Sequence, residues 1–275
     1  MSNLYASLAI IKNRLAITAT DWDADMLRLA GSASRFIDNF IRRRFYIWEG
    51  IRYYDGDKVV KVLNDDLQSI TMLAVDLDGD GVYESTFAVT DYFAMPHDST
   101  PKTWLEINPN GSYSSLGDGV HKALKVTGLF GYGNDWPASY LADSGDTVQN
   151  DPSISATATT LTVVSGALFS PGQTLRIESE QLYVSAVSSN NLTVERGVNG
   201  TTGAVHVKTK AISIYQYPEP VRDAALIQCA RWWKRKDSAY QDAVGMAELG
   251  QVMVYKGLDA DVRLMLEPYI KRRFA

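Results

Sequence analysis

Apolar residues recur at helical spacing in a segment near the start of the chain. They follow one another in steps of four, three, four and three residues, which places them on one side of an α-helix. Three arginines at positions 42–44 close the run, where positive charge offsets the negative end of a helix dipole. The pattern predicts a helix over Met26–Arg44. Its apolar positions are Met26, Ala30, Ala33, Ile37 and Phe40.

A second helical pattern follows Pro220. Proline suits a first helical turn, because its missing N–H would have no partner there. At about 100° per residue, the apolar residues of the run fall on one half of the helix. The other half forms a basic helix face, composed of Arg231, Lys234 and Arg235. A helix of this kind packs on one side and exposes positive charge on the other. The alternative is that these charges form an ordinary solvated helix face without a binding role.

The chain between these helices has a different texture. From Phe45 to Gly133, short apolar runs alternate with Gly, Asp, Asn and Pro, which is typical of strands joined by tight turns. The pattern predicts a meandering sheet or long hairpins. The following polar stretch, Asn134–Pro152, is predicted to be a linker. The predicted strands are Ile51–Tyr54, Val59–Leu63, Ile70–Val75, Tyr83–Val89, Trp104–Ile107 and Leu124–Gly128.

Residues 153–216 are rich in Thr, Ser and Val and alternate between apolar and polar positions. They show no helical periodicity. Several strands within roughly sixty residues predict a small barrel or sandwich. Because helical patterns precede and follow this stretch, we interpret it as an insertion into a host domain. The predicted strands are Thr160–Val164, Thr174–Ile177, Gln181–Val187, Asn191–Glu195 and Ala211–Tyr215.

Together these patterns predict an α+β fold. Its body would be a helical bundle formed by the N- and C-terminal helices, with a central β-hairpin or sheet region, over residues 1–145 and 217–275. A small all-β barrel or sandwich domain at residues 146–216, called the β-rich segment below, would be inserted into it. A last helix is predicted after Asp259, which is a suitable N-cap residue.

Composition narrows the function classes without naming one. The chain has 275 residues, a net charge of −5 and a single cysteine, Cys229. The overall charge does not favour nucleic acid, so any contact with DNA must be local. The lone cysteine excludes an internal disulfide, and its helical position predicts a small buried side chain. We recognise no secretory signal and no apolar run near the roughly 18 residues of a membrane span, so we expect a soluble protein.

An acidic run with interspersed glycines is the clearest candidate for chemistry. Asp76, Asp78 and Asp80 occupy alternate positions, a spacing that suits a hard, oxygen-seeking cation such as Ca²⁺. An EF-hand loop needs a glutamate at its twelfth position, where this chain has Phe87, although Glu84 could substitute as a ligand. A hairpin turn whose Asp and Gly residues satisfy the local backbone explains the same residues. Calcium and a plain turn stay open, and no other cofactor is expected.

No other group of residues forms a catalytic pattern. His97, His121 and His206 lie far apart and lack neighbours at metal-ligand spacing, so we expect surface or packing roles for them. Cys229 has no partner motif for nucleophilic catalysis. The glycine-rich run at 128–133 lacks the Lys-Ser/Thr pair of a P-loop. Because no acid and base pair can be nominated, we expect no enzymatic activity; a calcium-dependent enzyme would depend on the acidic run alone.

Four short motifs follow one another along the chain, at Met26–Arg44, Val126–Tyr132, Pro218–Asp237 and Gly257–Tyr269. Their series resembles that of the head–tail connector proteins of tailed bacteriophages, the adaptors between portal and tail. Met26–Arg44 resembles their opening helices, and Val126–Tyr132 resembles the strand that closes their β region. Pro218–Asp237, with its Arg-Trp-Trp-Lys-Arg-Lys-Asp sequence, resembles the helix that follows. Gly257–Tyr269 resembles their C-terminal end. Each motif is short and degenerate, so the resemblance depends on the series. Simple adaptors lack the β-rich segment.

The resemblance implies a structural virion protein that forms a ring of about twelve copies under the portal. The ring would extend the DNA channel, pass genomic DNA without sequence recognition, and provide the attachment platform for tail or neck proteins. The protein would be made in the host cytoplasm and reside in the neck of the virion, without a membrane. Contact with the portal protein is implied for the C-terminal part. The implied docking residues are Asp261, Tyr269, Lys271, Arg272 and Arg273.

A second interpretation belongs to a different class of protein. The Thr- and Asn-rich turns of the β-rich segment are also typical of a surface- or glycan-binding module carried on a helical scaffold. The two functions differ in assembly. A connector joins a large ring on the portal, whereas a binding module keeps its affinity as an isolated segment.

Overall fold

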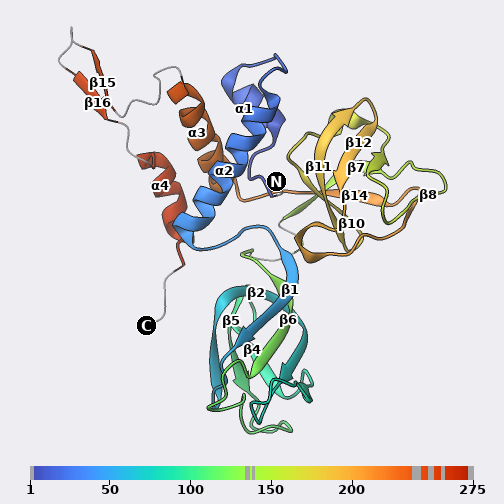
Figure 1. Ribbon diagram of the computed structural model, residues 1–275, viewed down its shortest axis with the longest axis vertical. Helices are drawn as coiled ribbons and strands as arrows, with labels where there is room; N and C mark the ends of the chain where they lie inside the picture. Colours follow the sequence, from blue (N-terminus) through green and yellow to red (C-terminus); the bar gives the residue numbers. More distant parts are fainter. Residues whose placement is uncertain are drawn as a thin grey trace. The chain divides into compact units, whose positions relative to one another are not determined.

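The computed structural model describes residues 3–133, 137, 140–236, 243–246, 251–254 and 258–271. The chain divides into two compact units. The first unit comprises Met1–Arg42, Leu141–Val198 and Thr202–Ala275, and the second comprises Arg43–Tyr140 and Asn199–Thr201. The first unit holds the helices and one six-stranded sheet. The second unit holds another six-stranded sheet (Figure 1).

Among the described residues, four α-helices from both ends of the chain cluster in the first unit (Figure 1). They are α1 (Leu8–Leu15), α2 (Asp23–Ile41), α3 (Glu219–Arg235) and α4 (Ala260–Leu266), and a short 3-10 turn at Glu267–Tyr269 follows α4. Helix α3 contacts α1, α2 and α4. The first and last helical parts of the chain therefore share one packing centre.

The sequence pattern explains which sides of α2 and α3 are buried. Met26, Ala30 and Ile37 of α2 are buried, as the helical spacing predicts. In α3 the thiol of Cys229 is 2% exposed, which confirms the prediction of a buried side chain. Burial raises the pKa of this thiol to about 12, so it stays protonated and inert near neutral pH. Between the two helices, the rings of Phe36 and Trp232 pack edge to face at 5.7 Å.

The second unit is built on the first sheet, whose strands follow the order β1-β6-β2-β5-β4, with β3 paired to β2. All of its pairings are antiparallel. The central strand β2 merges two strands that the sequence pattern separates. The strands are β1 (Trp48–Tyr54), β2 (Val60–Val75), β3 (Ser85–Phe87), β4 (Tyr92–Met95), β5 (Lys102–Ile107) and β6 (Leu124–Phe130).

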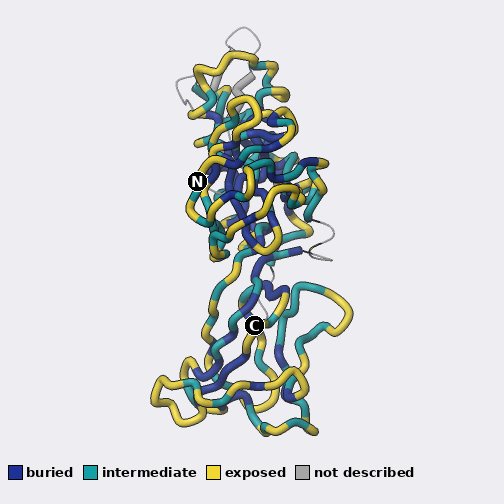
Figure 2. The backbone as a smooth tube through the Cα atoms, turned by 90° about the vertical axis from the view of Figure 1, so that its right-hand side faces the viewer, coloured by how far each residue is buried: buried dark blue, intermediate teal, exposed yellow. Residues whose placement is uncertain are grey.

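One face of the first sheet carries the core of the second unit. Leu67, Leu105, Leu124 and Val126 are fully buried in it. These buried residues, dark blue in Figure 2, run along the strands, while much of the connecting chain is exposed. Strand β6 shows the cause, because its residues alternate strictly between buried and half-buried positions, the period of a strand with one covered face.

The second sheet lies in the first unit, with the order β7-β14-β10-β11-β12-β9. A separate core of buried aliphatic residues, including Leu161, Leu182 and Val184, fills its interior. Two short two-stranded pairs complete the described strands, β8 with β13 and β15 (Ala243–Met246) with β16 (Gln251–Val254). The remaining strands are β7 (Leu141–Thr147), β8 (Ser153–Ile154), β9 (Thr160–Thr162), β10 (Thr174–Ile177), β11 (Glu180–Ser188), β12 (Asn191–Glu195), β13 (His206–Val207) and β14 (Ala211–Tyr215).

The predicted fold class is wrong. The sequence pattern predicts a helical bundle with a small inserted β domain, but the described chain is mostly β, with two six-stranded sheets. Two of the four helices are short, with eight residues in α1 and seven in α4. The physical reason lies in the stretch after residue 45. Its strands pair over long lengths and enclose a core of their own, so the helices form a minor part of the protein.

The predicted linker at 134–152 is also wrong in part. Residues Leu141–Thr147 form β7, which pairs with β14 at the edge of the second sheet. The sequence of β7 is polar, so it gives no alternating apolar signal. Its pairing depends instead on the β14 partner far along the chain.

The N-terminal segment and the first residues of α1 link α2 to the loop before β10 within the first unit. The backbone N–H of Tyr5 donates to Ser34 Oγ of α2 at 3.0 Å. The backbone N–H of Leu8 donates to the carbonyl of Pro171 at 3.0 Å, and that of Ala9 donates to Ser170 Oγ at 3.0 Å. Hydrogen bonds from one short segment thus hold parts that are distant in sequence.

The separate core of the second sheet leads to a stability prediction. Replacing the fully buried Leu161 by alanine should lower the free energy of unfolding by about 2–5 kcal/mol, since it removes buried apolar surface and leaves a cavity. Leu168, 49% exposed, supplies the matched control, and its alanine variant should change stability by less than about 0.5 kcal/mol. Urea unfolding followed by circular dichroism measures both, and equal losses would contradict this core.

Candidate functional sites

The acidic run forms the turn after β2. The carboxylate of Asp76 is buried and accepts two backbone hydrogen bonds, from Gly79 N to Oδ1 at 2.7 Å and from Gly81 N to Oδ2 at 2.8 Å. Both glycines have positive φ, +84° and +89°, a conformation that favours glycine. Burial opposes the negative charge of Asp76, but the N–H groups of Gly79 and Gly81 hold its pKa below the ordinary value.

The exposed acids of this turn have similar local partners. Asp78 Oδ1 accepts the N–H of Asp80 at 3.3 Å, and Asp80 Oδ1 accepts the N–H of Val82 at 2.7 Å. Carboxylate oxygens of Asp76, Asp78 and Glu84 lie within 4.8 Å of one another, and Asp80 does not belong to this group. Three of the four predicted ligands therefore converge, while their oxygens also serve the turn. Calcium binding here stays a prediction.

The basic helix face includes a residue that contacts another helix. Arg231 Nη1 lies 2.5 Å from Asp259 Oδ2, so this guanidinium ties α3 to the start of α4. Asp259 is also the N-cap residue of α4, as predicted, and its Oδ1 accepts the N–H of Asp261 at 3.0 Å. Lys234 is exposed and Arg235 is half-buried. Of the three predicted residues, Arg231 has a structural role within the helix cluster.

Of the C-terminal residues implied in portal docking, Asp261 lies in the first turn of α4, and the others follow that helix in sequence. Asp261 is exposed, whereas Tyr269 and Lys271 are half-buried. The backbone N–H of Lys271 donates to the carbonyl of Ile41 at 2.9 Å, which fastens this end of the described chain to the end of α2. Arg272 and Arg273 lie outside the described residues.

The three histidines have different environments. His97 is exposed, with its ring edge-on to Phe93 at 5.7 Å. His121 is exposed, and its Nδ1 lies 3.5 Å from a carboxylate oxygen of Asp55. His206 is fully buried in β13, the partner of β8. Within the described part of the chain, none of the three belongs to a group of potential metal ligands.

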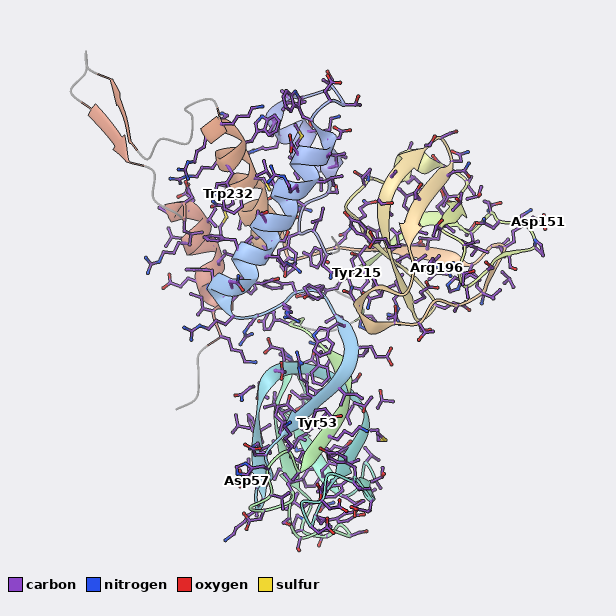
Figure 3. All side chains as sticks on the ribbon, in the orientation of Figure 1. Tyr53, Asp57, Asp151, Arg196, Tyr215 and Trp232 are labelled. Carbon is purple, nitrogen blue, oxygen red and sulfur yellow. The ribbon has the colours of Figure 1, made fainter. Side chains whose placement is uncertain are left out.

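Sequence patterns missed a buried ionic cluster in the second sheet. The carboxylate of Glu180, fully buried, accepts two hydrogen bonds from the guanidinium of Arg196, each at 2.7 Å. It also accepts the backbone N–H groups of Gly197 and Ala204, at 3.0 and 2.9 Å, and Nε2 of His206 lies 2.8 Å from it. Figure 3 labels Arg196 among the strands of this sheet. The residues lie 16 to 26 positions apart, so no local motif could reveal them.

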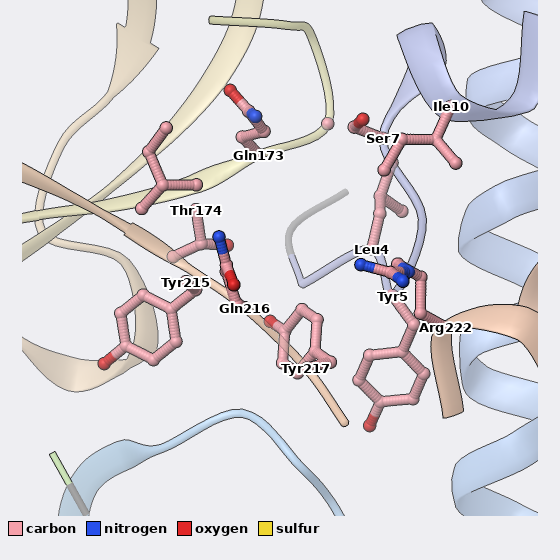
Figure 4. A pocket seen from close by; sticks show the side chains of 12 residues that line it. Leu4, Tyr5, Ser7, Ile10, Gln173, Thr174, Tyr215, Gln216, Tyr217 and Arg222 are labelled. Atoms are coloured by element: carbon pink, nitrogen blue, oxygen red, sulfur yellow. The ribbon is translucent and has the colours of Figure 1, made fainter. Parts of the chain in front are cut away.

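A cavity of about 140 Å³ lies in the first unit, between the N-terminal segment, the second sheet and α3 (Figure 4). Its walls include Tyr5, Thr174, Tyr215 and Arg222. The guanidinium of Arg222 is the one charged group among its lining residues and lies 3.6 Å from Glu219. Since this positive charge already has an acidic neighbour, the cavity has no strong preference for a charged ligand.

Comparison with known protein families finds no matching family model, and comparison with curated proteins finds no match. The likeness to connector proteins therefore depends on the short sequence motifs alone. Among the described residues, no helix is both long enough and apolar enough to cross a bilayer.

The turn geometry predicts a specific role for Asp76. Replacing Asp76 by asparagine should lower the melting temperature at neutral pH, because Gly79 and Gly81 lose a charged acceptor. Since the pKa of Asp76 is lowered in the folded protein, its contribution is present above the unfolded pKa and is lost as the pH falls through the folded value. The exposed Asp80→Asn variant is the control and should show a smaller loss, by scanning calorimetry between pH 2 and 7.

The calcium alternative has a separate test on the same turn. A cation bound only by the folded protein raises its melting temperature in a concentration-dependent way. If the convergent carboxylates bind Ca²⁺, added calcium should stabilise the protein and a chelator should reverse the effect, and Asp78→Ala should abolish both responses. A melting temperature indifferent to calcium and chelator, together with a silent Asp78→Ala variant, would leave only the turn.

Proposed function

We propose that this protein is a structural head-to-tail adaptor of a tailed bacteriophage. It would form a ring under the portal, extend the DNA channel and carry the attachment platform for the tail. The proposal comes from the series of connector-like motifs. Its main structural support is that the first and last of these motifs belong to one helical cluster.

The placement of the motifs in the structure supports one scaffold. Met26–Arg44 contains most of α2, and Pro218–Asp237 contains α3. These two helices pack directly against each other, and α4, from the last motif, packs on α3. Such a scaffold, built from both chain ends, fits the helical bundle that the resemblance implies.

The first sheet offers surfaces suited to assembly. Ile51 and Met72 both pair with Thr127, so the three residues form a row across one face. Ile51 is 42% exposed and Met72 is 36% exposed. A third exposed apolar residue of this sheet, Val62, is 45% exposed and pairs with Trp104. Grouped exposed apolar residues are typical of surfaces that contact other proteins.

Assembly on the portal is the decisive experiment. Mixed with the portal protein of its phage, the purified protein should form a complex that electron microscopy shows as a ring on the portal axis. Mass spectrometry of purified necks should also detect this chain. Failure of the protein to bind the portal, together with its absence from the neck, would overturn the proposal.

The docking residues have a sharper test of their own. A Lys271→Glu, Arg272→Glu, Arg273→Glu variant should bind the portal at least about tenfold more weakly if this end docks, because reversed charges repel the acidic partner that cations attract. The control is Lys208→Glu, since Lys208 lies between β13 and β14, outside the helices, and is paired with Asp151. Equal affinity of both variants, measured by interferometry, would remove the C-terminal end from the docking surface.

A further inference from the structure

The imidazole of His206 lies between two carboxylates. Its side chain has no solvent exposure. Nδ1 is 2.9 Å from Glu178 Oε2, and Nε2 is 2.8 Å from Glu180 Oε2. Each ring nitrogen therefore lies at hydrogen-bond distance from a carboxylate oxygen. An ionised carboxylate can accept hydrogen bonds but cannot donate them.

Around His206, basic and acidic side chains alternate in a chain of ion pairs. Glu180, at the start of β11, pairs with Arg196, which follows β12. Glu178, in the turn between β10 and β11, pairs with Lys210, which precedes β14, at 2.6 Å. Strand β8, the hydrogen-bonded partner of β13, contributes no ionisable side chain. The flanking Lys208 and Asp151 pair with each other at 2.9 Å.

Both glutamates favour the ionised state. Hydrogen bonds from Lys210 and His206 hold the pKa of Glu178 below its ordinary value. Burial opposes the charge of Glu180, but hydrogen bonds from Arg196 and the backbone N–H of Ala204 hold the pKa of this carboxyl below its ordinary value as well. Both carboxylates thus remain acceptors in mildly acidic solution.

The protonation state of the imidazole decides how many of these contacts can form. A neutral imidazole has one N–H and one lone pair, so it donates to one carboxylate and turns the lone pair toward the other. An imidazolium donates to both. The observed geometry, with both nitrogens on carboxylate oxygens, fits the imidazolium.

We propose that His206 is an imidazolium in the folded protein in mild acid, and that loss of its ring proton to solvent releases the Glu178 carboxylate. The turn between β10 and β11 is then fastened in acid and loosened as the pH rises. This proposal is independent of the connector function.

The turn itself is suited to such control. Glu178 has φ +54°, a conformation that is uncommon for residues other than glycine. The turn is held by its contacts. One of them is a 2.8 Å hydrogen bond that Nε of Arg176, on β10, donates to the backbone carbonyl of Glu178. The Glu178 side chain is 45% exposed, and once its contact with His206 is lost, the half-exposed ion pair with Lys210 is the remaining side-chain contact of its carboxylate. Glu180, enclosed by four other donor groups, stays in place.

Nuclear magnetic resonance of the full chain tests this directly. The chain has three histidines, so a His97→Gln, His121→Gln background leaves His206 as the sole imidazole signal. With ¹⁵N-labelled histidine, the ring should show two protonated nitrogens at pH 5.5 and one at high pH. Over the same transition, the hydrogen-exchange rate of the Ser179 amide, corrected for its intrinsic pH dependence, should rise roughly tenfold. A factor of this size corresponds to the loss of one hydrogen bond to a charged group.

Two glutamate variants separate the proposed contact from general charge effects. Glu178→Gln removes the charge next to the ring, and the proton should then leave His206 at lower pH than in the unaltered protein. Glu195→Gln, on the exposed part of β12, should leave the transition where it is. A ring that is neutral throughout pH 5.5–8, or equal transitions in the two variants, would overturn the proposal. If Glu178→Gln fails to fold, the spectrum of the sole-histidine protein still decides it.

Discussion

The packing of α3 against the other helices is the contact on which the first unit depends. Helices as short as α1 and α4 are marginal in water by themselves, so they persist because Ile11, Val262 and Leu266 are buried in the cluster. The ion pair between Arg231 and Asp259 adds a fixed link between α3 and α4. The helical ends of the chain are consequently one structure, even though two sheets lie between them in sequence.

Local periodicity explains which elements could be predicted from the sequence. The helices α2 and α3 were predictable because their apolar residues repeat every three or four positions. In the second sheet, the predicted strands at 174–177, 191–195 and 211–215 coincide with β10, β12 and β14. Strand β12 shows the alternation directly, because its residues are exposed and buried in turn. Such elements are specified by their own residues.

What could not be predicted depends on partners far away in the chain. The polar strand β7 exists because β14 lies beside it, and the fold class depends on how far β2 and β6 extend together. The same holds for the candidate sites. The acidic turn was visible as a motif, since its donors and acceptors lie within six residues. The ionic cluster around Glu180 joins separate strands, and neither spacing nor composition marks it.

Strand β2 carries a constraint on how the length of this chain can vary. It pairs with β5 through its first half and with β6 through its second, and its register shifts between Val62 and Leu67 and again before Ser69 and Met72. Neighbouring side chains point to opposite faces of the sheet. The insertion or deletion of one residue in this strand would therefore move every later side chain of the strand to the other face. Related proteins should therefore tolerate insertions and deletions in the loops around β2 but keep the number of residues within it.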